Sequence, residues 1–453
     1  MNSDNPRPGV SPFTGSSLGR RDFLRLAGAG AGLLGLAPVL AACGSGKAET
    51  GSTQRVNSFG DVTVPQIQKL LEIDPANSLS GEKFRIGALL PLSGAGTYYG
   101  DVQSKGLNLA AKNIKALGGP DIEIVAKDHK SGDPQAGVSA FRELRADKVE
   151  FIASTYIADF YALLPAFRSS DVFVLEGGQQ GITDQVQAVP HYWSGDVSVD
   201  GYYLLLFKYI RETKPDAKKV ASISVDVGEA VRKAARITLP EAAAKFGFEI
   251  VMEEYVPYGT TEFSQLLSKA QSKNPDILLN GMSPGGGLLA KQAKQLGLTV
   301  PQYGGNLAVD DVGVGGAALD GFTFASYWLN SQSPASPFGQ YFVSEWDKSY
   351  GTQPLKPDAY GSITYDITFQ FWQLWMAAKK AGLPINQASL NKIAGQTAVK
   401  SVFGGTKDAA GVLRWDPATH FPNGEIGVFE VSKGDITQKA RSDVDGMTNF
   451  QKV

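Results

Sequence analysis

From Phe84 onward, the hydrophobic positions of the chain form short β-rich runs separated by longer helical patterns. The runs FRIGALLP, IEIVAKDH, EFIAST and VFVLEG lie within residues 84–177, with helical patterns of a dozen or more residues between them. Strands and helices that alternate in this way predict βαβ units around a parallel sheet. We therefore expect the first block to fold as an α/β lobe.

A second block repeats this pattern over residues 220–306, with the strand-like runs KVASISVD, FEIVMEEYV, PDILLNG and PQYGGN. In the helix expected at 261–273, apolar residues recur at i, i+3, i+4 and i+7, which forms one stripe that can pack on a sheet. Further helices are expected at about 336–351 and 359–381, where Trp372 and Trp375 are predicted to be core residues. The last strands are expected in GVLRWDP and GEIGVFEVS.

These blocks predict two lobes of similar size, and 453 residues are enough for both. Lobe 1 is expected to comprise residues 82–195 and 329–400. Lobe 2 is expected to comprise residues 196–328 and 401–453, so that the chain crosses between the lobes more than once.

A different pattern precedes the lobes. Residues 20–46, RRDFLRLAGAGAGLLGLAPVLAACGSG, place two arginines before a weakly apolar run that ends at Cys43, the single cysteine. The run is shorter than the ~20 residues of a membrane-spanning helix, and its glycines and Pro38 disfavour a core helix. A basic region, an apolar region and small residues before a cleavage site indicate a signal peptide, here residues 1–42.

Two short motifs in this leader carry resemblances. Arg20-Arg21 and the residues around them resemble the twin-arginine export motif, and Leu40-Ala41-Ala42-Cys43 resembles the lipobox of bacterial lipoproteins. The resemblance implies export, acylation of Cys43 and a membrane anchor. Residues 43–81 then form a flexible tether, since GSGKAETGSTQ is rich in glycine and hydroxyl residues. The alternative is a chance arginine pair before a cleaved Sec signal, with a free thiol.

Composition excludes several classes of function. The net charge of −2 leaves no basic face for nucleic acid. One cysteine allows no intramolecular disulfide. The three histidines have no metal-ligand spacing, so we expect neither a metal site nor a cofactor.

The two blocks also resemble a known family. FRIGALLPLSGAGTYYG, followed by a long helix ending in ALGG and then DHKSGDPQAGV, is similar to the opening of type I periplasmic binding proteins of the leucine/isoleucine/valine-binding branch. VPYGTTEFSQLLSKAQSKNPDILLNG and LLAKQAKQLGL in the second block are typical of the same branch. The resemblance implies two Rossmann-like lobes with parallel sheets, a three-crossover hinge, and closure of the cleft around a ligand.

Ligands in open α/β sheets bind beyond the carboxyl ends of the strands. The loops in that position are 92–100, 154–161, 176–183, 226–229, 281–287 and 305–311. The predicted ligand contacts in them are Tyr99, Ser154, Thr155, Tyr156, Gly178, Gln179, Gln180, Asp226, Ser283 and Asn306. Glycine permits close backbone approach to a ligand, and the resemblance assigns the aromatic contact to Tyr99 rather than Tyr98.

The chain departs from the amino-acid binders of that branch. Their carboxylate-binding hydroxyls fall here on Tyr156 and Ile157 and on 178–180, and their ammonium-binding carboxylate falls on Asn306. Either Asp226 or Asp310 therefore replaces that carboxylate, or the ligand is not an amino acid.

One motif suggests an enzyme. Gly281-Met282-Ser283-Pro284-Gly285 matches the nucleophile elbow of serine hydrolases, and Asp310 and His420 follow in the required order. Pro284 argues against this interpretation, because the residue after the nucleophile must donate its backbone N–H and proline has none.

The sequence thus predicts a lipid-anchored, extracytoplasmic solute receptor of an ABC importer, without enzymatic activity. Its expected partners are a small amino-acid-like, amide or other neutral or zwitterionic ligand, the permease subunits, and the membrane through Cys43. A ligand sensor that transports nothing is the alternative, and a serine hydrolase is the weakest one.

Overall fold

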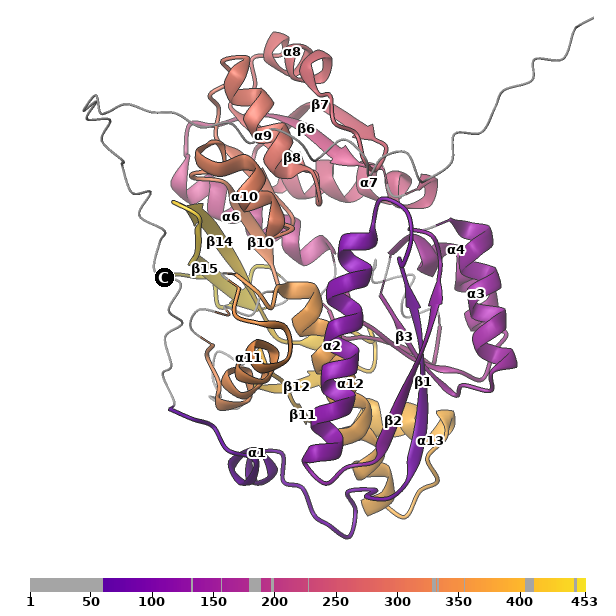
Figure 1. Cartoon of the computed structure of the whole chain (residues 1–453). Coiled ribbons are helices and arrows are strands. Elements are labelled where there is room, and N and C mark those ends of the chain that lie inside the picture. Colours follow the sequence, from indigo (N-terminus) through magenta and orange to yellow (C-terminus); the bar gives the residue numbers. More distant parts are fainter. Residues whose placement is uncertain are drawn as a thin grey trace, which may run out of the picture. The chain divides into compact units, whose positions relative to one another are not determined.

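The computed structural model describes residues 60–453 except 132, 156, 179–188, 197–198, 227, 328–330, 332–333, 354, 404–410 and 444–445. All of these described residues belong to one compact unit, Thr50–Val453 (Figure 1). The predicted signal peptide, with Arg20, Arg21 and Cys43, lies outside the described residues. Within the described ranges, no helix has the length and apolar character needed to cross a membrane.

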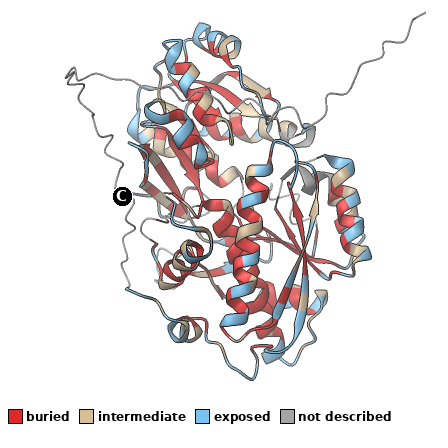
Figure 2. Cartoon of the chain, viewed as in Figure 1, coloured by how far each residue is buried: buried red, intermediate tan, exposed pale blue. Residues whose placement is uncertain are grey.

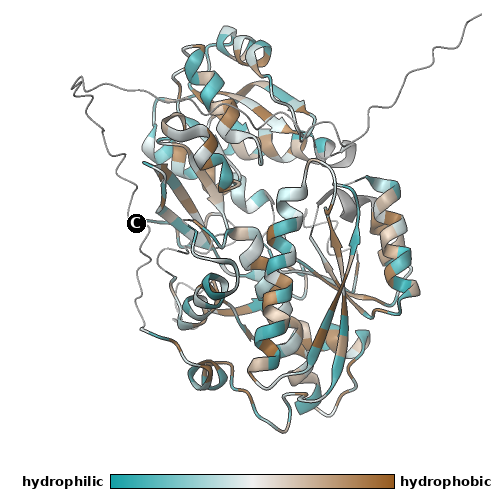
Figure 3. Cartoon of the chain, in the orientation of Figure 1, coloured by the Kyte–Doolittle hydropathy of each residue, from teal (hydrophilic) through white to brown (hydrophobic). Residues whose placement is uncertain are grey.

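The first block forms a parallel five-stranded sheet in the order β2-β1-β3-β4-β5. Its strands are β1 (Lys83–Leu90), β2 (Asp121–Asp128), β3 (Phe151–Ser154), β4 (Phe173–Glu176) and β5 (Tyr192–Ser194). The helices between them are α2 (Thr97–Ala116), α3 (Pro134–Ala146) and α4 (Ile157–Arg168). Hydrophobic residues concentrate along β1 and β3, whose inner positions are buried (Figure 3).

The second block forms a sheet in the order β16-β15-β14-β10-β9-β8-β6-β7. Its parallel part comprises β6 (Lys219–Val225), β7 (Glu249–Val256), β8 (Ile277–Gly281), β9 (Gln302–Gly304) and β10 (Thr323–Ser326). The antiparallel strands β14 (Glu425–Ser432), β15 (Asp435–Asp443) and β16 (Gln451–Lys452) extend it. The helices of this part are α6 (Val199–Thr213), α7 (Glu229–Lys245), α8 (Ser264–Ser272), α9 (Gly286–Gln295) and α10 (Asp310–Gly315), and η2 (Gly316–Ala318) is a 3₁₀ turn.

The remaining elements pack near the first sheet. They are α11 (Pro337–Tyr350), α12 (Ala359–Lys380), α13 (Gln387–Ala394) and a small antiparallel sheet of β11 (Val399–Lys400), β12 (Val412–Trp415) and β13 (Pro422–Asn423). Helix α12 lies alongside α2 and is buried over most of its length (Figure 2). The two helices approach closely at glycines, since a Cβ on Gly106 would lie 2.3 Å from the backbone oxygen of Gly361. Trp372 and Trp375 are fully buried, as predicted.

The chain passes between the two sheets three times: after β5, after β10 and after β13. The predicted fold class, two α/β lobes with parallel sheets joined by three crossovers, is therefore confirmed. We refer below to the elements around the first sheet as lobe 1 and to those around the second sheet as lobe 2.

One predicted boundary is wrong. Residues 43–81 were expected to form a tether, but α1 (Val64–Leu70) and the residues after it pack against lobe 1. Ile67 and Leu79 are buried in its core, and the indole Nε1 of Trp372 donates to the backbone oxygen of Ser78 at 2.9 Å. The sequence of a short amphipathic segment does not show whether a surface is available for it to pack on. Here α11 contacts α1, and Trp372 of α12 contacts the residues after it.

The sequence analysis expected the chain to return from lobe 1 to lobe 2 at residue 401, and this boundary stays a prediction. The contacts of β12 are with β5 of lobe 1: Trp415 donates through Nε1 to the backbone oxygen of Ser194 at 2.7 Å, and its ring lies 6.3 Å from that of Trp193. These contacts favour a return to lobe 2 after β13 rather than at 401.

Candidate functional site

The loops at the carboxyl ends of the two sheets contact each other directly. Tyr99, in the first turn of α2, donates its hydroxyl hydrogen to the backbone oxygen of Ser283, and its oxygen lies 3.0 Å from the Ser283 hydroxyl. Asn306, after β9, donates through Nδ2 to the hydroxyl of Tyr360 at 2.5 Å. Tyr99, Ser283 and Asn306 were predicted as contacts of one ligand, and the structure brings them together across the lobes.

A cluster of tyrosines connects these contacts. The Tyr99 ring lies edge-to-face with that of Tyr360, with centroids 4.6 Å apart, and with that of Tyr98 at 5.3 Å. Tyr99 is only 4% exposed. Its ring therefore packs on two other tyrosines, whereas the resemblance implied that it packs on the ligand. Burial raises the pKa of Tyr360 well above its ordinary value, so its hydroxyl is neutral and can accept the Asn306 hydrogen bond.

Ser154 and Thr155, at the end of β3, are both fully buried. Thr155 donates its hydroxyl hydrogen to the backbone oxygen of Leu89 at 2.7 Å, which fixes the loop after β3 to β1. The hydroxyl of Ser154 has no hydrogen-bond partner in the described part of the chain. An unpaired buried hydroxyl is costly. The Ser154 hydroxyl can therefore still donate and accept, whereas the Thr155 hydroxyl has already donated its hydrogen.

Sequence reasoning missed Gln103, one helical turn after Tyr99 on the same face of α2. Its Nε2 donates to the backbone oxygen of Thr155 at 3.0 Å, and its Oε1, fully buried, has no partner among the described residues. Gly178 lies beside it with a φ of +114°, and a Cβ there would come within 3.1 Å of the Tyr360 ring. The i, i+4 spacing from Tyr99 is the signal that could have identified Gln103.

Tyr360 was also missed. It lies in the first turn of α12, where the Asp358 side chain caps the helix by accepting from the backbone N–H of Gly361 at 3.0 Å. This cap fixes where the helix begins and so where the Tyr360 side chain projects. The sequence analysis expected a helix from residue 359 but assigned no site residue to its start.

The two aspartates proposed to replace the missing carboxylate are both paired with cations. Asp226 forms an ion pair with Arg232 and accepts from the backbone N–H of Gly228 at 2.9 Å. The hydrogen bond from Arg232 lowers the pKa of Asp226 below its usual range. Asp310 lies 3.0 Å from the Nζ of Lys356. An ammonium group that uses either carboxylate would compete with the cation already paired with it.

Three predicted contacts, Tyr156, Gln179 and Gln180, lie outside the described residues. Of the other predicted contacts, Gly178 and Thr155 lie close to Gln103, and Asp226 lies in the loop after β6.

The hydrolase interpretation has no structural support. His420 stacks on Trp193 with ring centroids 4.1 Å apart, and its Nδ1 lies 2.9 Å from the backbone oxygen of Tyr192. Ser283 instead bonds to Tyr99, and Asp310 pairs with Lys356. The predicted acid, base and nucleophile therefore have other partners. No cluster of three or more potential metal ligands occurs in the ranges that the structure describes.

Residues 83–435 match the sequence profile of the periplasmic binding protein family. The chain belongs to this family. Its members are extracytoplasmic binding proteins rather than enzymes, which agrees with the prediction that the chain has no catalytic site.

Similar proteins support this assignment. The chain is 27% identical over 233 residues to the Leu/Ile/Val-binding protein BraC3 of Rhizobium johnstonii, a match that covers 49% of this chain and 60% of the relative. Its fold is similar to that of a leucine-binding protein from Thermotoga maritima, with a TM-score of 0.66, 20% identity, and coverage of 79% of this chain and 98% of the other. A solute-binding protein of R. palustris in complex with benzoate gives a TM-score of 0.67 at 18% identity, covering 79% and 95% of the two chains.

Proposed function

We propose that this periplasmic binding protein is a lipid-anchored solute receptor of an ABC importer. Family membership supports extracytoplasmic solute binding, and the leader motifs support the anchor. Acylation of Cys43 would hold the two lobes near the membrane, where the permease subunits of an importer are located. Because α1 packs on lobe 1, the tether in this proposal runs from Cys43 only to about residue 63.

The ligand in this proposal is small, polar and without net charge: an amino-acid-like compound, an amide or another neutral or zwitterionic molecule. The pairing of Asp226 with Arg232 and of Asp310 with Lys356 carries this choice. Both candidate carboxylates are already neutralised, which disfavours a ligand held mainly by a charge. Ser154 Oγ and Gln103 Oε1, which lack a partner in the described part of the chain, favour a ligand held by hydrogen bonds.

An aromatic monocarboxylate is the second candidate. The tyrosine cluster of Tyr98, Tyr99 and Tyr360 offers ring edges and faces for an aromatic ligand, and aromatic pairs add about 0.5 to 1.5 kcal/mol beyond the area that they bury. The benzoate complex of the similar R. palustris protein shows that this fold accommodates such ligands.

A thermal-shift screen separates the two candidates. The purified chain is heated with branched-chain amino acids, their amides, benzoate, 4-hydroxybenzoate, polyols and nucleosides, each at equal concentration. A ligand at a hundred times its dissociation constant stabilises the folded protein by about 2.7 kcal/mol. Stabilisation by amino acids or amides supports the first candidate, and stabilisation by the benzoates alone supports the second. Stabilisation only by phosphorylated or dicarboxylic compounds in an extended screen would contradict both.

A further inference from the structure

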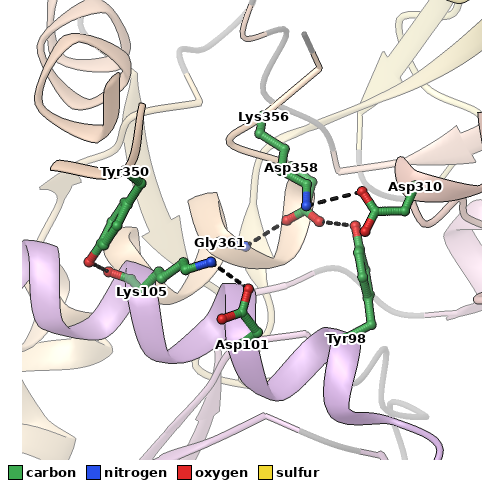
Figure 4. A network of polar contacts seen from close by, with 8 residues as sticks. All are labelled: Tyr98, Asp101, Lys105, Asp310, Tyr350, Lys356, Asp358 and Gly361. Carbon is green, nitrogen blue, oxygen red and sulfur yellow. Dashed lines mark hydrogen bonds and ion pairs between the residues drawn. The ribbon is translucent and has the colours of Figure 1, made fainter. Parts of the chain in front are cut away.

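A polar network joins the two lobes outside the predicted ligand contacts (Figure 4). On lobe 1 it comprises Tyr98 of α2 and the segment that leads into α12, with Lys356 and Asp358. On lobe 2 it comprises Val309 and Asp310, where α10 begins. Neither Lys356 nor Asp358 was a candidate residue in the sequence, because residues 351–358 follow no strand end.

Two direct bonds cross from one lobe to the other. Lys356 Nζ lies 3.0 Å from a carboxylate oxygen of Asp310, and the backbone N–H of Val309 donates to the Tyr98 hydroxyl at 3.2 Å. Tyr98 in turn donates its hydroxyl hydrogen to Asp358. The Tyr98 hydroxyl is therefore held from both sides.

The network holds Lys356 in place. Its Nζ also lies 5.4 Å from the centroid of the Tyr98 ring, and its side chain is only 16% exposed. Asp358 is fixed by capping α12. A lysine in such a position loses little side-chain freedom when it pairs with Asp310, which makes this pair stronger than one between two freely moving side chains.

We propose that Lys356 and Asp310 are positioning residues that stabilise contact between the lobes without any ligand. A ligand that binds only when the lobes are in contact benefits from every bond that favours that arrangement, whatever its own chemistry. The pair therefore raises the affinity for all ligands by one common factor. This common factor is separate from the effect proposed above, in which the pairing of Asp310 with Lys356 disfavours an ammonium partner. The proposal rests on the two-lobed fold and not on the ligand class proposed above.

The size of this common affinity factor follows from how exposed Lys356 and Asp310 are. Asp310 is 61% exposed, and partly exposed ion pairs have modest energies that salt reduces. We expect the loss of either charge to lower the ratio of joined to separated lobes about two- to fivefold, and salt to produce a similar loss in the unsubstituted protein.

Residue-resolved hydrogen exchange of the ligand-free full chain tests whether the Lys356–Asp310 pair stabilises contact between the lobes. The Val309 amide is the reporter, since among the described residues it donates to the Tyr98 hydroxyl of the other lobe. Lys356→Met removes the charge but keeps an apolar stem beside Tyr98, and Asp310→Asn removes the partner's charge. Lys348→Met is the matched control, because it breaks the Lys348–Glu345 pair of 2.7 Å inside α11 and leaves the lobe contact intact.

We expect the Val309 amide to exchange about two- to fivefold faster in either single variant, with no further increase in the double variant, because both remove the same bond. Raising the salt from ~50 mM to ~500 mM should accelerate exchange in the unsubstituted chain and not in the variants. Unchanged exchange in both single variants would overturn the proposal. An additive effect in the double variant, or an equal acceleration in Lys348→Met, would also overturn it. The same holds if all amides in α9 and α10 accelerate to the same extent, because that result indicates local unfolding.

Discussion

Asp366 gives the sharpest prediction about stability. It lies in the interior of α12, is 1% exposed, and accepts hydrogen bonds from the Ser401 hydroxyl at 2.9 Å, the Val402 N–H at 2.8 Å and the Gln370 side-chain amide at 2.8 Å. No lysine or arginine among the described residues forms an ion pair with Asp366. Burial raises the pKa of Asp366 from 3.8 to about 6, although these three donors oppose the change.

The sign and size of the pH effect follow from this pKa. An acid whose pKa is higher in the folded than in the unfolded state stabilises the fold when it is protonated. The contribution of Asp366 is therefore fully present below about pH 4 and is lost as the pH rises through 6. Since one pKa unit corresponds to about 1.4 kcal/mol, the loss between pH 4 and pH 7 is about 3 kcal/mol.

Asp366→Asn should remove this dependence. Asparagine is isosteric and cannot ionise. The Gln370 amide now donates to Asp366 through Nε2, and if it turns over, its Oε1, which has no partner among the described residues, can accept from the asparagine Nδ2. Relative to the unsubstituted chain, we expect the variant to be no more stable at pH 4 and more stable by up to about 3 kcal/mol at pH 8.

Urea unfolding monitored by tryptophan fluorescence, at half-unit pH intervals from 4 to 8, measures the difference. Asp276→Asn is the control, because backbone N–H groups of Lys219 and Lys218 lower the pKa of Asp276 below 3.8, so its contribution to stability stays nearly constant from pH 4 to 8. A stability difference between Asp366→Asn and the unsubstituted chain that stays constant from pH 4 to 8 would refute the reasoning.

Three further predictions concern the anchor, export and the cleft. Cys43→Ala should move the protein from the membrane to the soluble fraction with an unchanged melting temperature; a variant still found with the membranes contradicts the lipid anchor. Replacing Arg20 and Arg21 by lysine should leave precursor in the cytoplasm, and normal processing on an immunoblot would indicate the Sec route. With the best compound of the thermal-shift screen, Tyr99→Ala and Asn306→Ala should each weaken calorimetric affinity about tenfold or more, whereas unchanged affinity in both means that the site lies elsewhere.

The burial of Tyr99 predicts a second effect of Tyr99→Ala, on the stability of the empty protein. An exposed aromatic could be removed without affecting the empty protein, but Tyr99 is buried against Tyr98 and Tyr360 and bonds to Ser283. We therefore expect Tyr99→Ala to lower the melting temperature of the empty protein. Tyr99→Phe, which keeps the ring, separates this packing from the hydroxyl contact.

The fold could be predicted because its signals are local. Helices expected at about 336–351 and 359–381 are found at 337–350 and 359–380, since apolar periodicity, the Ser336 and Asp358 caps and the Gly351 and Gly382 turns all lie within or next to them. The packing of α1 and the joined state of the lobes depend on contacts between distant parts of the chain. Tyr98 and Asp358, which bond to each other, are 260 residues apart.

The same reasoning explains why the residues of the candidate site could be predicted only in part. Strand ends mark where a cleft forms, and this rule identified Tyr99, Ser283 and Asn306, which do contact the opposite lobe or its residues. It could not identify Gln103 and Tyr360, because both come from helices. It also could not foresee that Asp226 and Asp310 are paired, since their partners lie six and 46 positions away, outside any regular helical spacing.

We expect the ligand selectivity of the proposed site to come largely from polar groups that have no partner among the described residues. Tyr99 is bonded to Ser283 and Asn306 to Tyr360, so a ligand that takes over either bond gains only the difference between the new bond and the lost one. A ligand that reaches Ser154 Oγ or Gln103 Oε1 satisfies a buried polar atom without breaking an existing bond, and leaving such an atom unpaired costs about 1 to 3 kcal/mol. Under the proposed function, we expect the bonded residues to affect how readily the lobes join, and Ser154 and Gln103 to affect which molecule is bound. A ligand that presents one hydrogen-bond acceptor to the Ser154 hydroxyl and one donor to the Gln103 oxygen fits both, which describes an amide or an amino acid better than a simple benzoate.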